Sequence, residues 1–255
     1  MALGGGDNGG INAMPTWISA HPSKRAGTRL DRHEFIDAIT IRYDWPVVEP
    51  PDKCPGCHED FDLRHALKCK TGGAPSRRHD EVRDTIGAIC HRAGLDTTRE
   101  PVITTDSTDP ITGGKIKGLR ADLLVKGLDT TEGTAAIDFS IHDASPASYV
   151  NKSPAKIIAA RERAKRRKYG VAVAQKGWTF KPFTLLAEEG AYGGGADDVI
   201  TKLAKRIADK EQNEQARVES TIRRRIAFAV IRGTSRCIRS KRVVWNKVGL
   251  CVYDG

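Results

Sequence analysis

Two aspartates lie inside apolar stretches whose residues suit β-strands, which is an unusual place for a carboxylate. Asp122 lies within Leu119–Val125, and Asp138 lies within Ala136–Ile141. A buried carboxylate is costly unless it is paired or binds a metal ion. Mg²⁺ and Mn²⁺ prefer oxygen ligands, and such ions can activate water for attack on phosphorus. The two aspartates therefore predict a divalent-metal site for phosphodiester hydrolysis.

A strongly basic segment follows the second aspartate. Residues 151–170 contain eight Lys or Arg and one acid. Either Lys165 or Lys168 could orient the attacking water or neutralise the charge that develops in the reaction. We expect Glu100 to give outer support to the metal, and Tyr169 to support the helix or to contact DNA. The alternative is that the aspartates are only hydrogen-bonded or ion-paired residues of a sheet.

Four possible metal ligands lie upstream in the pattern C-x2-C-x7-H-x3-C. Cys54 and Cys57 bracket a tight turn, while His65 and Cys69 are four residues apart and share one face of a helical turn. Three thiolates and one imidazole at these spacings suit tetrahedral zinc with no open coordination position. We therefore predict a structural zinc site, the alternative being a loop of free thiols.

The charge of the chain is unevenly distributed. The net charge is +10 with an isoelectric point near 9.4, yet residues 95–141 carry an acidic excess between basic segments. A basic frame around an acidic pocket suits a polyanion held over metal ions, although a solubilising surface is the plainer interpretation. The chain has no apolar run of about 18 residues and no signal-peptide pattern, so we expect an intracellular protein with no membrane partner.

Hydrophobic spacing and turn residues predict the order of the elements. Helices are expected over 31–43, from about 80 to Gly94, over 154–168, and once or twice over 196–232. Strands are expected over 99–103, 119–125, 136–141, 171–174 and 179–185, with a polar hairpin over 104–118.

This order predicts an α/β protein organised in four segments. Residues 1–28 are rich in Gly and are expected to be disordered. Residues 29–75 would form a helix and a small CCHC zinc knuckle, and residues 76–195 an α/β core. Residues 196–255 would form a basic helical C-terminal extension.

Several basic residues are candidates for contact with nucleic-acid phosphates. They are Arg77, Arg78, His79, Arg161, Arg166, Arg167, Arg223 and Arg224. The clusters at 165–168 and 239–242 could instead be nuclear-import signals or solvated faces of helices.

The predicted order of a helix, three strands that carry acids, a basic helix and a further strand is similar to the core of PD-(D/E)XK nucleases, the restriction-endonuclease-like fold. In that pattern, an Asp on the second strand is followed by acid-x-Lys on the third. Here the third strand has Asp138 followed two residues later by Ser140, so Ser stands at the Lys position. The resemblance implies that a lysine of the next helix, Lys165 or Lys168, takes its place.

The flanking motifs sharpen the resemblance. The C-x2-C-x7-H-x3-C pattern is followed by Arg78-His79-Asp80, Arg99-Glu100-Pro101, Arg120-Ala121-Asp122, Asp138-Phe139-Ser140 and Lys165-x2-Lys168-Tyr169. Together these resemble the C-terminal zinc-knuckle and endonuclease region of site-specific non-LTR retrotransposons, over roughly residues 30–195. Ala121 replaces the Pro that usually precedes the first Asp in that family.

The resemblance implies a nuclear endonuclease that nicks target DNA, with structural Zn²⁺ and catalytic Mg²⁺ or Mn²⁺. It implies DNA and the element's RNA as partners, together with a reverse transcriptase in a longer polyprotein. The alternative is a degenerate module that binds nucleic acid without cutting it, which Ser140 favours. A retroelement remnant without activity and a relative of Holliday-junction resolvases are further alternatives, and the latter does not explain the cysteine cluster.

Overall fold

A computed structural model describes residues 17–43, 45, 50–109, 112–130, 133–142, 153–187 and 190–241 of this protein. Its helices are η1 (Trp17–Ser19), α1 (Arg32–Arg42), α2 (Leu63–Lys68), α3 (Ala74–Arg92), α4 (Pro154–Gln175), α5 (Gly194–Glu211) and α6 (Gln215–Arg239). Its strands are β1 (Thr97–Arg99), β2 (Ser107–Thr108), β3 (Lys115–Ile116), β4 (Leu123–Lys126), β5 (Thr134–His142), β6 (Thr179–Leu186) and β7 (Ala191–Tyr192).

A five-stranded mixed sheet forms the centre of the molecule, in the order β1-β4-β5-β6-β7. β1, β4 and β5 are antiparallel, and α4 then leads to β6, which is parallel to β5. β5 is buried along most of its length, which agrees with its nearly continuous apolar sequence. This confirms the predicted α/β class.

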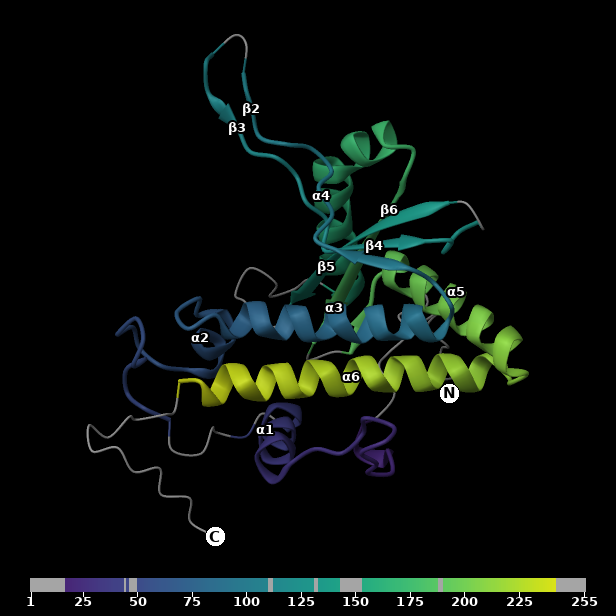
Figure 1. Ribbon diagram of the computed structural model, residues 1–255. Coiled ribbons are helices and arrows are strands. Elements are labelled where there is room, and N and C mark those ends of the chain that lie inside the picture. Colours follow the sequence, from purple (N-terminus) through teal and green to yellow (C-terminus); the bar gives the residue numbers. More distant parts are fainter. Residues whose placement is uncertain are drawn as a thin grey trace, which may run out of the picture.

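Helices cover both faces of the sheet (Figure 1). One face packs with α3, α5 and α6 in the main hydrophobic core, to which β5 contributes Ile137 and Phe139. The other face packs on α4 through Leu124, Ala136 and Val173. Alternation along β5 therefore sends Ile137 and Phe139 to one layer and Ala136 and Asp138 to the other.

The helix boundaries follow local sequence signals. Asp31 and Glu34 form a capping box at the start of α1, in which each side chain accepts a hydrogen bond from the backbone N–H of the other residue. Pro154 occupies the first turn of α4, where its missing N–H costs little. α5 buries Val199, Leu203 and Ile207, which confirms the helical period read from the sequence.

One predicted strand and one predicted helix start were wrong. Residues 171–174 do not form a strand, because α4 continues to Gln175 and buries Tyr169 and Val173, one turn apart, against the sheet. α3 begins at Ala74, so Arg77 and Asp80 lie within the helix and do not precede it.

The predicted strand over 99–103 is interrupted. β1 ends at Arg99, and Glu100 has a left-handed backbone with φ of 48°, after which Val102 makes an isolated bridge with Arg120. The hairpin predicted between residues 104 and 118 does form, as β2 and β3, and it projects away from the sheet (Figure 1).

The predicted division of the chain into segments needs two corrections. α5 and α6 do not form an appended extension, because their apolar faces complete the main core together with α3 and the sheet. Residues 17–28 are not disordered, since the guanidinium of Arg232 on α6 donates to the carbonyl of Gly27 and Thr28 is buried. Residues 1–16 and 242–255 lie outside the described residues.

α3 and α6 lie side by side (Figure 1), and they approach closely at Gly233. A Cβ at Gly233 would lie 2.6 Å from Cγ and 2.9 Å from Cα of Arg78. The two helices can therefore adopt this spacing only with glycine at that position.

We predict that Gly233→Ala lowers the free energy of unfolding by about 1–3 kcal/mol, because the methyl group must push α3 away from α6. Gly87→Ala is the matched control, since a Cβ there meets nothing within 4 Å and alanine favours the helix. Urea unfolding of both variants tests this. Equal effects of the two substitutions would contradict the close approach.

Candidate functional site

The four predicted zinc ligands converge on one point. Cys54 and Cys57 lie on the loop before α2, His65 lies in α2, and Cys69 caps its C-terminus. Cys69 Sγ lies 3.9 Å from Cys54 Sγ and 3.8 Å from Cys57 Sγ, and Cys57 Sγ lies 3.2 Å from His65 Nε2. A tetrahedron with zinc–sulfur bonds of about 2.3 Å has edges of about 3.8 Å. This Cys3His cluster could therefore hold a metal ion, and its geometry suits zinc.

The surroundings of the cluster favour a thiolate at Cys54 and a fixed imidazole at His65. Burial raises the pKa of Cys54, but hydrogen bonds from the backbone N–H groups of Cys57 and Gly56 and from the His65 side chain lower it to about 6. The carboxylate of Glu59 lies 3.3 Å from His65 Nδ1, which leaves Nε2 for a metal. Sequence reasoning missed Glu59, although an acid between the second Cys and the His was visible.

The segment that contains the cluster, residues 53–71, is called the zinc unit below. It packs on the end of α6, where Ala66 and Leu67 contact Cys237 and Ile238. The ammonium of Lys241 donates to the carbonyl of Thr71 at the other end of the unit. The zinc unit is thus joined to the rest of the molecule by apolar packing as well as by the chain itself.

We predict that the purified protein contains about one zinc ion per chain, because the donors already approach tetrahedral geometry. Cys57→Ser should lose most of that zinc. Cys90→Ala should retain it, because Cys90 is buried in the main core away from the cluster. Metal analysis by mass spectrometry measures both. Full zinc content in Cys57→Ser would contradict the assignment.

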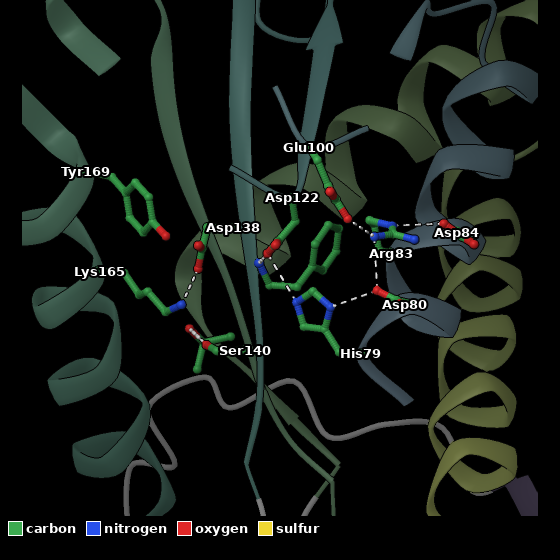
Figure 2. A network of polar contacts seen from close by, with 12 residues as sticks. His79, Asp80, Arg83, Asp84, Glu100, Asp122, Asp138, Ser140, Lys165 and Tyr169 are labelled. Atoms are coloured by element: carbon green, nitrogen blue, oxygen red, sulfur yellow. Dashed lines mark hydrogen bonds and ion pairs between the residues drawn. The ribbon is translucent and has the colours of Figure 1, made fainter. Parts of the chain in front are cut away.

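Asp122 directly precedes β4, and Asp138 lies in the adjacent strand β5. Leu123, the first residue of β4, pairs with Ile137, and the N–H of Asp122 donates to the carbonyl of Ile137 at 3.0 Å. The N–H of Phe139 also donates to Asp122 Oδ2 at 2.6 Å. Figure 2 shows both carboxylates between α4 and α3.

Asp138 is the more deeply buried aspartate, with 3% of its surface exposed. Its carboxylate forms an ion pair with the ammonium of Lys165, which reaches it from α4 (Figure 2). Lys168 donates instead to the hydroxyl of Tyr169 at 2.9 Å. Of the two predicted lysines, the structure therefore brings only Lys165 to an aspartate.

Tyr169 is buried on the sheet side of α4, with 4% of its surface exposed. Burial, together with the nearby charge of Asp138, raises the pKa of Tyr169 above its ordinary value. Its ring stacks on Phe180 at a centroid distance of 5.2 Å. Tyr169 therefore supports the helix, and the predicted alternative of DNA contact does not agree with its burial.

His79 from α3 contacts the second aspartate. Its Nε2 lies 3.2 Å from Asp122 Oδ2, and its Nδ1 lies 3.4 Å from Asp80 Oδ1. Burial lowers the pKa of His79, but the two carboxylates outweigh burial and raise it above its ordinary value. Burial conversely raises the pKa of Asp122, while His79, the N–H of Phe139 and the charge of Lys165 bring it below its ordinary value.

These opposite shifts predict a pH window for the pair. The raised pKa of His79 stabilises the fold fully below about pH 6.5, and this contribution is lost as pH rises through the folded-state pKa. The lowered pKa of Asp122 contributes above about pH 4 and is lost as pH falls through its folded-state pKa.

We therefore expect the stability difference between wild type and His79→Gln to be largest near pH 5–6 and to shrink toward pH 9. Urea unfolding across this pH range measures it. A difference that does not change with pH would show that His79 is not charged in the folded protein.

Glu100 does not join the aspartates. Its side chain is exposed, and its carboxylate lies 3.4 Å from NH1 of Arg83. Arg83 also contacts Asp80 at 3.0 Å and Asp84 at 2.9 Å, and is itself buried (Figure 2). Among the described residues, the Cys3His group is the one cluster of three or more possible ligand atoms. Sequence reasoning missed Arg83, although its spacing from Asp80 is that of a helical ion pair.

The predicted phosphate-binding residues differ in how far they are exposed. Those exposed at the surface are Arg77, Arg161, Arg166 and Arg167, whereas Arg224 is half-buried. Arg223 is buried and forms ion pairs with Asp197 at 2.8 Å and Glu219 at 2.7 Å, so its predicted contact with nucleic acid was wrong. Arg78 is also buried, in the contact between α3 and α6.

A cleft of about 720 Å³ borders both Asp122 and the zinc unit. It is lined by His79, Asp122 and Ser140, and also by Lys68 and Lys70 of the zinc unit. The hydroxyl of Ser140 lies 3.0 Å from that of Thr184. The cleft therefore gives solvent access to Asp122 and His79.

Comparison of the sequence with models of known protein families and with characterised proteins gives no match. None of the described helices is both long and apolar enough to cross a bilayer.

Proposed function

We propose that this protein is a metal-dependent DNA endonuclease that nicks its target, of the type found in site-specific non-LTR retrotransposons. The observation that carries the proposal is a pair of aspartates, Asp122 directly before β4 and Asp138 in the adjacent antiparallel strand β5. Lys165 contacts Asp138, and His79 contacts Asp122. Two carboxylates with a nearby lysine are the groups that phosphodiester hydrolysis needs. The resemblance to this family also implies that DNA is the partner and that the protein acts in the nucleus. It further implies a reverse transcriptase elsewhere in a longer polyprotein.

The arrangement of elements supports a restriction-endonuclease-like core. α3 precedes three antiparallel strands, and α4 then connects β5 to the parallel strand β6. Asp122 directly precedes the second main strand and Asp138 lies in the third, which is close to the pattern of the resemblance. Topology alone does not establish function, so the proposal depends on the side chains.

The donor set suits Mg²⁺ or Mn²⁺. Magnesium in phosphate chemistry is commonly held by one or two carboxylates together with substrate oxygens and water. Asp122 and Asp138 would supply the carboxylates, and a bound ion would lower the pKa of a water molecule and polarise the phosphate. Asp122 borders the cleft, whereas the carboxylate of Asp138 is held by Lys165.

The protein's own groups would complete the site. Lys165 balances the charge of Asp138 and would be the lysine that neutralises charge developing on the phosphate. Tyr169, one helical turn later, keeps this part of α4 on the sheet by stacking on Phe180. His79 holds the carboxylate of Asp122 toward α3 and adds positive charge beside the cleft.

A binding module without cleavage is the second candidate, and three observations favour it. Ser140 stands at the usual lysine position and contacts Thr184. Lys165 is engaged with Asp138, and the carboxylate of Glu100 is turned to Arg83. Such a protein would bind nucleic acid equally well with and without Mg²⁺.

We predict that the protein converts supercoiled plasmid to open circles in Mg²⁺ or Mn²⁺, and that Asp138→Asn and Asp122→Asn lower the rate by at least about 100-fold. Asp209→Asn is the control, because Asp209 is exposed on α5. Gel analysis of plasmid forms measures the rates.

Unchanged nicking in both site variants would refute the assignment of the aspartates. Binding of DNA by the wild-type protein with no cleavage in either metal would favour the binding module.

A further inference from the structure

The cleft beside Asp122 is lined in part by residues that have no role in the proposed nuclease site. Lys68 and Lys70, on either side of the zinc ligand Cys69, line this cleft together with Asp122 and Arg120. The zinc unit therefore does more than fold a separate piece of chain, because its last turn forms part of the cleft surface.

The positive charges of the cleft differ in how they are balanced. Arg83 is neutralised by Asp80, Asp84 and Glu100. Lys68, Lys70 and Arg120, in contrast, are exposed, and none of them has an ion pair with a described residue. Three unpaired cations that line one cleft favour an anionic ligand.

The two lysines are held in place from both sides. On one side, α2 packs on α6 through Ala66 and Leu67. On the other side, α3 begins five residues after Cys69, and the guanidinium of Arg77 donates to the carbonyl of Gly72 at 2.7 Å. These contacts fix the backbone that carries the two lysines, so less backbone freedom is lost when a ligand binds than on a mobile loop.

We propose that Lys68 and Lys70, with Arg120, hold the phosphate backbone of the nucleic acid that enters this cleft. The ligand class rests on the proposed function, which makes nucleic acid the substrate, and the specific contact rests on the unpaired cations. Backbone contacts position a duplex without reading its sequence. The zinc unit would thus help to place the strand beside Asp122 by holding two phosphates in the same cleft.

The test is the salt dependence of duplex binding, measured by fluorescence anisotropy with a labelled DNA of arbitrary sequence. Zinc-loaded protein is used without Mg²⁺ and without chelator, so that cleavage does not interfere. Each phosphate contact contributes about 0.9 to the slope of log affinity against log salt. Lys68→Gln with Lys70→Gln should reduce the slope by about 1.8, and Arg120→Gln should reduce it by about 0.9 further.

Two further variants serve as controls. Lys126→Gln with Lys205→Gln removes the same charge from exposed lysines that do not line the cleft, and should leave the slope within about 0.5 of wild type. Lys68→Arg with Lys70→Arg retains the charge and should restore the slope. A mononucleotide competitor distinguishes a polynucleotide from a single phosphate, since it should displace the duplex only weakly.

An unchanged slope in the Lys68 and Lys70 double variant would overturn the inference, as would an equal loss in the control pair. The result is separable from that of the nicking assay. A protein that binds with the predicted slopes but does not cleave would retain this inference and lose the nuclease. Cleavage with an unchanged slope would support the nuclease and overturn this inference.

Discussion

The structure depends on the cost of burying one negative charge. Asp138 lies in the middle of the sheet with almost no exposed surface, and Lys165 is its counter-charge. Removing one partner of such a pair costs several kcal/mol, because the other charge is left buried and alone. α4 must therefore lie across β5 at the position that brings Lys165 to Asp138, and the packing of Tyr169 and Val173 holds it there. If residue 138 served the fold alone, an apolar side chain would cost less free energy to bury than this aspartate does.

α3 connects the zinc unit with the site around Asp122. It starts just after the zinc unit and places His79, Asp80 and Arg83 along one side of the cleft. His79 then contacts Asp122, and Arg83 contacts Glu100 beside the left-handed turn that ends β1. The position of the zinc unit and the orientation of the Asp122 carboxylate are thus set by the same rigid helix.

The sequence predicted what depends on local spacing. The CCHC pattern, Asp138 within an apolar strand and the helical period of α5 all lie within short windows, and the structure has each of them. Asp122, in contrast, directly precedes β4 and does not lie within it. Residues 171–174 were mistaken for a strand because two valines favour one, whereas their packing as a continuation of α4 depends on the distant sheet. The burial of Arg223 and the convergence of Lys68 with Asp122 likewise depend on contacts between distant segments, which no local pattern encodes.

α6 has a consequence for how the molecule unfolds. Its 25 residues contact η1 and α1 on one side, and α2, α3 and α5 on others. An ion pair between the half-buried Arg239 and the buried Asp37 also joins its C-terminal turn to α1. Because no part of α6 can open without exposing apolar surface on several neighbours, local opening is coupled to global unfolding. The zinc unit, the N-terminal helix and the sheet should therefore behave as one cooperative unit, with their slowest amide protons exchanging at a common rate.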